Sequence, residues 1–300
     1  MSILLPLRPW SMLGDVFADY LNVSFPKDVF ELVTRDVFPL LDEMGCSEVS
    51  PGLFQTEGKG TFKAYTRGKV GIFSASGVFL DCLRRVPGRF REYLGVIASY
   101  PHRVSLLHLT ADYMVEGPPA LIQEVKAKGL AGELSLTRKR IQPGQVSALL
   151  GVDLRGQETG TVYLGKRQNA DVWAKVYDKG HERESRGFPY PGPVARVEIA
   201  VQSDVGATLR DVESPESLFF HFASRSIAEG PPGVAEWSPH GEGYVLPPKV
   251  DRTALERIEG ILAGSLDFAR VVKLARDEYG DRSWEMTMST IRRCFANPIL

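Results

Sequence analysis

Short runs in which apolar and polar residues alternate constrain the fold of this chain more than any other feature of its sequence. Three of these runs cover residues 159–165, 171–177 and 194–201, and residues 52–80 hold several more that end at glycines. Side chains of a strand point alternately to the two faces of a sheet, so each run predicts a strand with one apolar and one polar face. Strands this short, separated by turn residues, favour antiparallel pairing.

Stretches with helical periodicity separate these strands. Apolar residues recur at intervals of three and four after Pro26, in a stretch that Pro39 is expected to kink or split. Further helices are predicted around residues 80–100 and over residues 118–129, the latter with proline at its start and glycine at its end. Two additional strands are predicted, over residues 17–25 and 104–115. The expected fold class is α+β, a mainly antiparallel sheet with packed helices, and no internal repeat is recognised.

The end of the chain differs in composition from the rest. Residues 230–250 are rich in glycine and proline and are predicted to form a linker or irregular loop. Residues 251–300 have a helical pattern throughout. We therefore divide the chain into a domain at 1–229, a linker at 230–250 and a small helical C-terminal unit at 251–300.

Composition limits the classes of protein to which this chain can belong. Of its 300 residues 43% are hydrophobic, an ordinary fraction for a globular protein, and the formal net charge is −1. Nucleic-acid binding therefore requires a local basic face, since the chain as a whole exerts no general attraction on phosphate. The cysteines are far apart and lack the spacing of a zinc site. No window approaches the ~18 apolar residues of a membrane span. We expect a soluble protein of the bacterial cytoplasm with no membrane partner.

The segment at 159–184 holds the residues best suited to chemistry. Its second predicted strand places Trp173, Lys175 and Tyr177 on one face, next to a basic connection that contains Arg167. A tyrosine among cations is suited to attack on a phosphodiester, because positive charge favours the phenolate and neutralises the approaching phosphate. The alternative is an ordinary strand tyrosine beside solvated lysines.

Charged residues on two other predicted strands need an explanation. Arg196 and Glu198 share one face of an otherwise apolar strand. They either pair with each other or with neighbours across the sheet, or Glu198 binds Mg²⁺ or Mn²⁺. His108 and Asp112 also share a face, but a separation of four residues is roughly 13 Å along a regular strand. They therefore cannot both bind one ion directly unless their strand bulges.

Four stretches together resemble the replication initiation proteins of rolling-circle plasmids and filamentous phages, of the Rep_trans type. Residues 18–25 resemble the opening strand of that family, and residues 105–113 resemble a strand with two aspartates four apart. Residues 161–182 resemble its tyrosine, glycine-serine-arginine and tyrosine-acid-lysine elements. Residues 195–201 resemble its arginine-x-glutamate strand. The resemblance spans most of the predicted first domain.

Two positions depart from the family pattern. His108 stands where the pattern has its first aspartate. Gly-Lys-Arg at 165–167 replaces glycine-serine-arginine, so Arg167 is the residue of that element that carries over.

The resemblance implies a rolling-circle initiator that nicks one strand at a double-strand origin. Tyr177 would attack the scissile phosphate, form a 5′-phosphotyrosine and leave a 3′-OH primer, with Tyr163 as the alternative nucleophile. The other candidate catalytic residues are Lys179 and Arg167. The implied cofactor is Mg²⁺ or Mn²⁺, and its expected ligands are Asp112, Glu198 and His108. Expected partners are double-strand origin DNA and single-stranded DNA, with a second copy of the chain and a host helicase as further candidates.

Basic residues supply the candidate DNA contacts. These are Lys175, Arg196, Lys166, Arg138, Lys139 and Arg140, together with a second cluster at Arg84, Arg85, Arg89 and Arg91. Charge runs are also the usual composition of a solvated surface. Two alternative functions stay open, namely an origin-binding regulator that does not nick and a metal-dependent nuclease that uses water and forms no covalent adduct.

Overall fold

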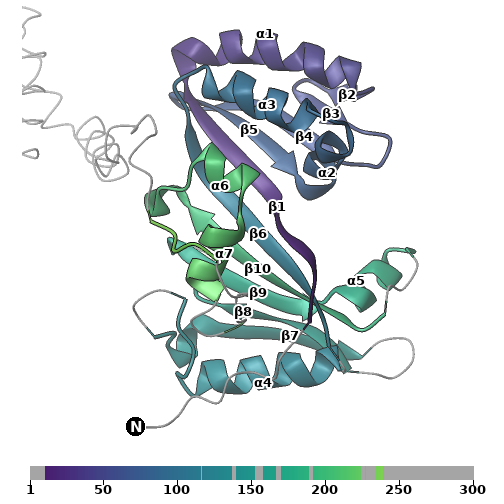
Figure 1. Cartoon of the computed structure of the whole chain (residues 1–300), viewed down its shortest axis with the longest axis vertical. Coiled ribbons are helices and arrows are strands. Elements are labelled where there is room, and N and C mark those ends of the chain that lie inside the picture. The colour runs from purple at the N-terminus through teal and green to yellow at the C-terminus, as the bar shows by residue number, and fades with distance from the viewer. Residues whose placement is uncertain are drawn as a thin grey trace, which may run out of the picture. The chain divides into compact units, whose positions relative to one another are not determined.

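A single sheet organises the part of the chain that the structure describes. The computed structural model describes residues 11–115, 117–136, 140–152, 158–166, 170–188, 192–223, 227 and 234–238. In these residues ten strands form one sheet in the order β2-β3-β4-β5-β1-β6-β10-β9-β8-β7, and each paired neighbour runs antiparallel (Figure 1). The predicted α+β class, a mainly antiparallel sheet with packed helices, is confirmed.

The first half of the chain builds one half of the sheet and three helices. In chain order the elements are β1 (Ser11–Pro26), α1 (Lys27–Glu43), β2 (Ser47–Ser50), β3 (Leu53–Gln55), β4 (Thr61–Arg67), β5 (Val70–Ser76), α2 (Gly77–Arg85) and α3 (Arg89–Ala98). The chain leaves β1 through α1, reaches the sheet edge at β2 and returns strand by strand until β5 pairs with β1.

The second half repeats this path on the other side. Its elements are β6 (Arg103–Met114), α4 (Pro118–Leu130), β7 (Val146–Val152), β8 (Glu158–Leu164), β9 (Val172–Asp178), α5 (Lys179–Ser185), β10 (Val194–Gln202), α6 (Leu209–Glu213) and α7 (Glu216–Ala223). The chain leaves β6 through α4, reaches the opposite edge at β7 and returns until β10 pairs with β6. The sheet therefore consists of two five-strand halves of the same topology, joined by the β1–β6 pair, although no repeat is recognised in the sequence.

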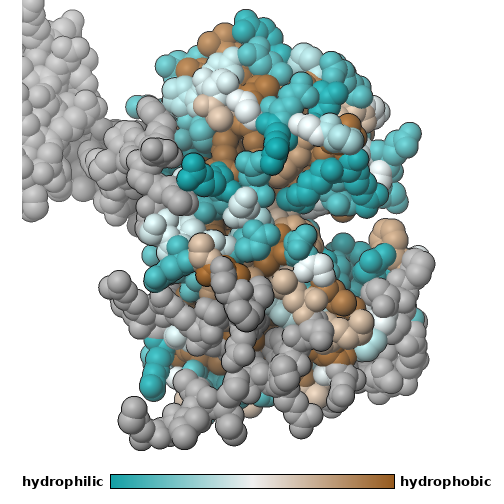
Figure 2. Space-filling view, viewed as in Figure 1, coloured by the Kyte–Doolittle hydropathy of each residue, from teal (hydrophilic) through white to brown (hydrophobic). Residues whose placement is uncertain are grey.

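Apolar side chains fill the space between one face of the sheet and the helices. Helix α1 contributes residues at helical spacing, since Phe30, Val33 and Val37 are all buried. The ring of Phe30 packs 5.3 Å from that of Phe73 on β5, measured between centroids. Helix α4 packs on β7, β8 and β9 at the other end of the sheet. Helices α6 and α7 both contact β1, a central strand of the sheet. Figure 2 shows hydrophilic residues interspersed with hydrophobic ones over the surface of α1 to α3.

Three details of the helices differ from the expectations. Helix α1 continues through Pro39 as one helix, so the expected split is wrong. Residues 80–100 form two helices, because Gly88 adopts a left-handed φ of 79° that interrupts the helical path between α2 and α3. The short helices α5 to α7 were missed, since fewer than nine residues hold too little periodicity to recognise.

Part of the predicted linker is attached to the first domain. Trp237 is buried, its indole N–H donates to Asp211 on α6 over 2.8 Å, and its ring packs on His221 and Phe222. The chain divides into two compact units, with the boundary between Tyr244 and Val245. The predicted helical unit at 251–300 lies outside the described residues. None of the described helices has the length and apolar character that crossing a bilayer requires.

Two glycines give opposite predictions for the same substitution. A Cβ on Gly71 of β5 would lie 2.0 Å from Cγ of Phe30, whereas a Cβ on Gly95 of α3 would meet nothing within 4 Å. We expect Gly71→Ala to lower the free energy of unfolding by about 1–3 kcal/mol through overpacking. Gly95→Ala should raise it by up to about 1 kcal/mol, because alanine is the better helix former. Urea denaturation of both variants tests this, and equal effects would contradict the packing described between α1 and β5.

Candidate functional site

The four stretches that carry the family resemblance lie next to one another in the sheet. They correspond to β1, β6, β10 and the β8–β9 hairpin, which are consecutive in the order β1-β6-β10-β9-β8. Residues of β6, β10 and β9 at alternate positions project from the face opposite the apolar core. The register sets Arg196 of β10 between Asp112 of β6 and Tyr177 of β9. A charged site therefore forms on the polar face, from segments that are distant in the sequence.

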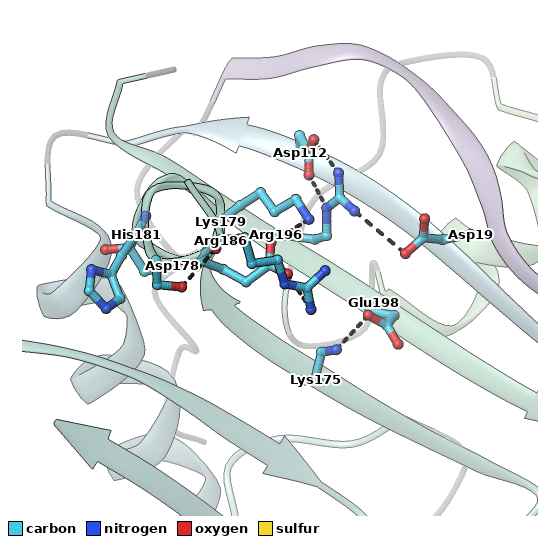
Figure 3. A network of polar contacts seen from close by, with 11 residues as sticks. Asp19, Asp112, Lys175, Asp178, Lys179, His181, Arg186, Arg196 and Glu198 are labelled. Carbon is cyan, nitrogen blue, oxygen red and sulfur yellow. Dashed lines mark hydrogen bonds and ion pairs between the residues drawn. The ribbon is translucent and has the colours of Figure 1, made fainter. Parts of the chain in front are cut away.

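Arg196 is the centre of this site. Its Nε and Nη2 donate to the two carboxylate oxygens of Asp112 over 2.6 and 2.8 Å, and its Nη1 lies 3.5 Å from Oδ2 of Asp19 (Figure 3). Arg196 is buried, and the hydrogen bonds and charge of Asp112 overcome the effect of burial and raise the pKa of the guanidinium. A bidentate pair of this geometry fixes the guanidinium plane as well as its position.

Asp19 reaches the site through an irregularity in β1. The register between β1 and β6 shifts between Ala18 and Tyr20, so Asp19 sits at a β-bulge. A bulge re-aims the side chain that it carries, and here it brings Asp19 to Arg196 although Tyr20 also lies on the polar face. Gly77 leaves room for the carboxylate, since a Cβ there would lie 2.0 Å from Oδ1 of Asp19. Burial raises the pKa of Asp19, despite the opposing charge of Arg196.

Glu198 is held between two nitrogen groups. Its Oε1 lies 2.8 Å from Nδ1 of His108, and its Oε2 lies 2.8 Å from Nζ of Lys175. Its side chain is only 5% exposed. Burial alone would raise the pKa of this carboxyl, but the hydrogen bond from His108 and the charge of Lys175 lower it to about 2. Glu198 is therefore ionised across the physiological range, and the expected pairing with neighbours across the sheet is the one found.

Tyr177 lies among the cations but is itself largely covered. Nζ of Lys175 is 4.3 Å and Nζ of Lys179 is 5.8 Å from the centroid of its ring, and Arg196 is its partner on β10. The residue is 7% exposed. Burial raises the pKa of the phenol, and the opposing charge of Arg196 does not compensate. The hydroxyl is therefore protonated in the free protein and has to lose its proton during any nucleophilic attack.

Helix α5 positions the second lysine over this tyrosine. Asp178 caps the helix, because its Oδ1 accepts from the backbone N–H of His181 over 2.9 Å. Lys179 is the first residue of the helix, and its Nζ donates to Glu182 over 2.6 Å. Burial and the charge of Arg196 lower the pKa of Lys179. Glu182 also pairs with Arg186, which is mostly exposed, so the network extends to the surface of α5 (Figure 3).

The predicted metal ligands do not form one ion site in this arrangement. Both oxygens of Asp112 accept from Arg196, and both oxygens of Glu198 contact His108 or Lys175. An ion bound by Asp112, Glu198 and His108 together would have to displace Arg196 from Asp112 and Lys175 from Glu198. No group of three histidine, cysteine, aspartate or glutamate side chains in the described part of the chain has the placement for a metal. The donor set therefore does not fit Mg²⁺ or Mn²⁺ as it stands.

A row of rings crosses the polar face beside the charged residues. Its centroids are 5.2 Å apart from Tyr20 to His108, 5.4 Å from His108 to Trp173 and 6.3 Å from Trp173 to Tyr163. Tyr163 of β8 pairs in register with Lys175 of β9, which is two residues before Tyr177 on that strand. The alternative nucleophile is thus on the same face as Tyr177, within the aromatic row and not between the two lysines.

The other predicted DNA contacts have different positions. Lys166 is exposed at the end of the β8 hairpin and Arg140 is exposed beside Ser135, whereas Arg167, Arg138 and Lys139 lie outside the described residues. In the second cluster each arginine has a partner within the chain. Arg84 donates to the carbonyl of Ala18, Arg85 pairs with Asp81, Arg89 pairs with Glu43 and Glu92, and Arg91 pairs with Glu213.

Two residues of the site were not predicted from the sequence. The sequence identifies Asp19 only as part of the opening strand, because regular alternation does not reveal a bulge. Thr110 lies between His108 and Asp112 on β6 and faces Glu198 in register, with its hydroxyl fully buried and without a hydrogen-bond partner among the described residues. The shared face of His108 and Asp112 was the signal that could have included it.

No protein-family model matches this chain, and no curated protein sequence matches it either.

The Arg196–Asp112 pair yields a prediction about stability. Removing one partner of a buried ion pair leaves the other charge uncompensated, so we expect Asp112→Asn to lower the free energy of unfolding by about 3 kcal/mol. Asp81→Asn is the matched control, because it breaks a pair with Arg85 in which both side chains are well exposed. That loss should stay below about 1 kcal/mol. Chemical denaturation measures both values, and similar losses would contradict a structural role for the buried pair.

The low pKa of Glu198 yields a prediction about pH. A carboxyl whose pKa is depressed in the folded state stabilises the fold above its unfolded value, and this contribution disappears as the pH falls through the folded value. For Glu198 these values are 4.5 and about 2. The wild type should therefore exceed Glu198→Gln in unfolding free energy near neutral pH, by on the order of 3 kcal/mol. The difference should shrink between these two pH values, and a difference that stays constant would contradict the predicted charge on Glu198.

Proposed function

We propose that this protein initiates rolling-circle DNA replication by nicking one strand at an origin, with Tyr177 as the nucleophile. The observation that carries the proposal is the placement of this tyrosine between Lys175 and Lys179 and directly across from Arg196. The four stretches that resemble the Rep_trans initiators supply this site together, as neighbours in one sheet. Two lysines against the ring of the tyrosine and an arginine across from it are suited to a reaction in which negative charge accumulates on a phosphate.

The ion pairs of the site hold these cations without exhausting their hydrogen-bond donors. The structure places one carboxylate contact on Nζ of Lys175 and one on Nζ of Lys179. An ammonium group has three donors, so each lysine retains two for a phosphate oxygen. Arg196 directs three of its five donors to Asp112 and Asp19. The carboxylates thus fix the positions of the cations in advance, which reduces the cost of ordering them around the transition state.

The proposed reaction is a transesterification. The oxygen of Tyr177 forms a bond to phosphorus while the bond from phosphorus to the 3′ oxygen breaks. The leaving 3′ oxygen takes up a proton from solvent and becomes the 3′-OH that primes synthesis. One phosphodiester is exchanged for another, so the nick can be closed by the reverse step. The proton of Tyr177 needs an acceptor, and we propose Asp19 for this role, because its Oδ2 lies 3.5 Å from Nη1 of Arg196, the residue across from Tyr177.

No step of this mechanism is assigned to a metal ion, since the carboxylates and His108 do not fit one ion site as arranged. Mg²⁺ or Mn²⁺ stays a prediction of the family resemblance, and so does the role of Arg167. The proposed substrates are double-strand origin DNA and the single strand that it releases. A second copy of the chain and a host helicase are the proposed protein partners, and the bacterial cytoplasm is the proposed location.

The test is a nicking assay on a supercoiled plasmid that carries the origin of the replicon encoding this chain. We expect open circles and DNA covalently attached to the protein, with the phosphotyrosine located by peptide mass spectrometry. Tyr177→Phe should abolish the adduct, whereas the matched control Tyr163→Phe, on the same face, should retain it. Each reaction is run with Mg²⁺, with Mn²⁺ and with a chelator, which measures the metal requirement directly.

The outcomes separate the competing functions. An adduct that disappears with Tyr163→Phe and survives Tyr177→Phe keeps the function and moves the nucleophile to β8. Nicking without any adduct indicates a nuclease that uses water. Tight origin binding with neither nicking nor adduct, in either metal, indicates a DNA-binding regulator and overturns the proposal.

A further inference from the structure

The two topological halves of the sheet also share a short sequence pattern, Lys-x-Tyr-x-basic-Gly, at equivalent positions. Strand β4 is the counterpart of β9, since each is the third strand from the β1–β6 junction in its half. Residues 63–68 at the end of β4 are Lys-Ala-Tyr-Thr-Arg-Gly, and residues 175–180 at the end of β9 are Lys-Val-Tyr-Asp-Lys-Gly. Lys63 and Tyr65 thus occupy the positions that Lys175 and Tyr177 occupy in the other half.

The strand registers agree with this correspondence. Lys63 pairs with Ser74 of β5 as Lys175 pairs with Glu198 of β10. Tyr65 pairs with Ile72 as Tyr177 pairs with Arg196. On the next strand, Asn22 of β1 faces Ser74 as Thr110 of β6 faces Glu198. Both Asn22 and Thr110 have a buried side-chain oxygen that lacks a hydrogen-bond partner among the described residues.

The N-terminal half lacks the acidic residues of the other half. Serine and isoleucine stand where β10 has Glu198 and Arg196, and β3, β4 and β5 contain no aspartate or glutamate. The cations of β4 are therefore not neutralised as Lys175 and Lys179 are. Among the described residues, no ion pair or hydrogen bond involves the side chain of Lys63 or Arg67. Both are exposed, and Tyr65 between them is 42% exposed.

Exposure differs between the halves because α5 is present in only one of them. In the C-terminal half, α5 follows β9 and brings Lys179 over the ring of Tyr177. In the N-terminal half a two-residue turn at Gly68 and Lys69 joins β4 directly to β5. The ring of Tyr65 and the charges of Lys63 and Arg67 are therefore available on the same face of the sheet as the proposed active site.

We propose that Lys63, Tyr65 and Arg67 form a second, non-catalytic site that binds single-stranded DNA. This inference rests on the proposed nicking function. In it, the N-terminal half of the sheet holds the single strand that the nick releases. Arg67 and Lys63 contact phosphates, and Tyr65 provides an exposed ring on which a base stacks. Cations without acidic neighbours beside an exposed aromatic ring are the combination that binds single strands without reading their sequence.

The site lacks what cleavage would require. Tyr65 has isoleucine across from it where Tyr177 has Arg196, and no carboxylate on β5 is available to orient Lys63. A phosphate at this position meets Lys63 and Arg67 but lacks the buried arginine, oriented by carboxylates, that lies across from Tyr177. The N-terminal half thus binds the strand and the C-terminal half carries out the reaction, at equivalent positions on the same face of the sheet.

Binding is measured by the fluorescence anisotropy of a labelled oligothymidylate at several salt concentrations, with the full chain. We expect Tyr65→Leu to weaken binding about tenfold, because one stacked base is lost. Lys63→Ala with Arg67→Ala should weaken it further and reduce the slope of log affinity against log salt by about 0.7 per cation removed. Lys126→Ala on α4, which packs on the opposite face, is the control for charge alone and should leave the affinity and slope of the wild type nearly unchanged.

Adduct formation at saturating plasmid is measured on the same variants, and it should be retained because the Tyr177 site is intact. Thermal unfolding confirms that each variant is folded. If both β4 variants bind the oligothymidylate like the wild type while the adduct still forms, the second site is refuted and the proposed function stands. If the wild type forms no adduct but the β4 variants lose binding, the nicking function fails and the binding site stands. Equal weakening by Lys126→Ala would also refute the inference, since it would indicate a general effect of charge.

Discussion

The buried guanidinium of Arg196 is the interaction on which the candidate site depends. It ties β10 to β6 through Asp112 and reaches β1 through Asp19, so three strands at the centre of the sheet meet at one side chain. Burying a charge is costly without a well-placed partner, and here the bidentate contact to Asp112 supplies one. The same group lies across from Tyr177. Stability of the central strands and the electrostatics of the proposed nucleophile therefore depend on the same side chain.

Much of the fold and the composition of the site could be predicted from the sequence. Alternation predicts that Lys175 and Tyr177 share one face of β9 and that Arg196 and Glu198 share one face of β10, and both predictions are confirmed. The register adds that all four lie on the same face of the sheet. Local patterns could not say which partner each charge takes, because pairing depends on strand order and register. The sequence therefore allows Glu198 to bind a metal, to pair with Arg196 or to pair across the sheet, and its contacts to His108 and Lys175 follow from the positions of β6 and β9 on either side of β10. The role of Asp19 could not be predicted for a related reason. A bulge breaks the alternation from which the direction of its side chain would be inferred.

The equivalence of the two halves was also invisible at the level of sequence. A given topology requires only that apolar residues recur on the face of each strand that packs against the helices. Many different apolar residues meet this requirement, so two segments with the same topology need not have similar sequences. The polar faces differ, with an ionic network in one half and hydroxyl groups and unpaired cations in the other. What they share is confined to six positions at the end of β4 and of β9, of which the lysine, the tyrosine and the glycine are identical. So short a match becomes informative only when both copies occupy the same place in the fold.

The bulge at Asp19 lets β1 hold one residue more than its pairing with β6 requires. Residues of β1 on one side of the bulge are aligned by pairing with β5, and residues on both sides pair with β6. A shift of one residue moves every side chain of a strand to the opposite face. Removal of Asp19 would cause no such shift, because Ala18 and Tyr20 would then be consecutive opposite Leu109 and His108, as in a regular ladder. The bulge therefore accommodates one additional residue, and that residue supplies the second carboxylate near Arg196. Loss of a residue between Tyr20 and Pro26 has no such compensation, because the pairing with β5 is regular there.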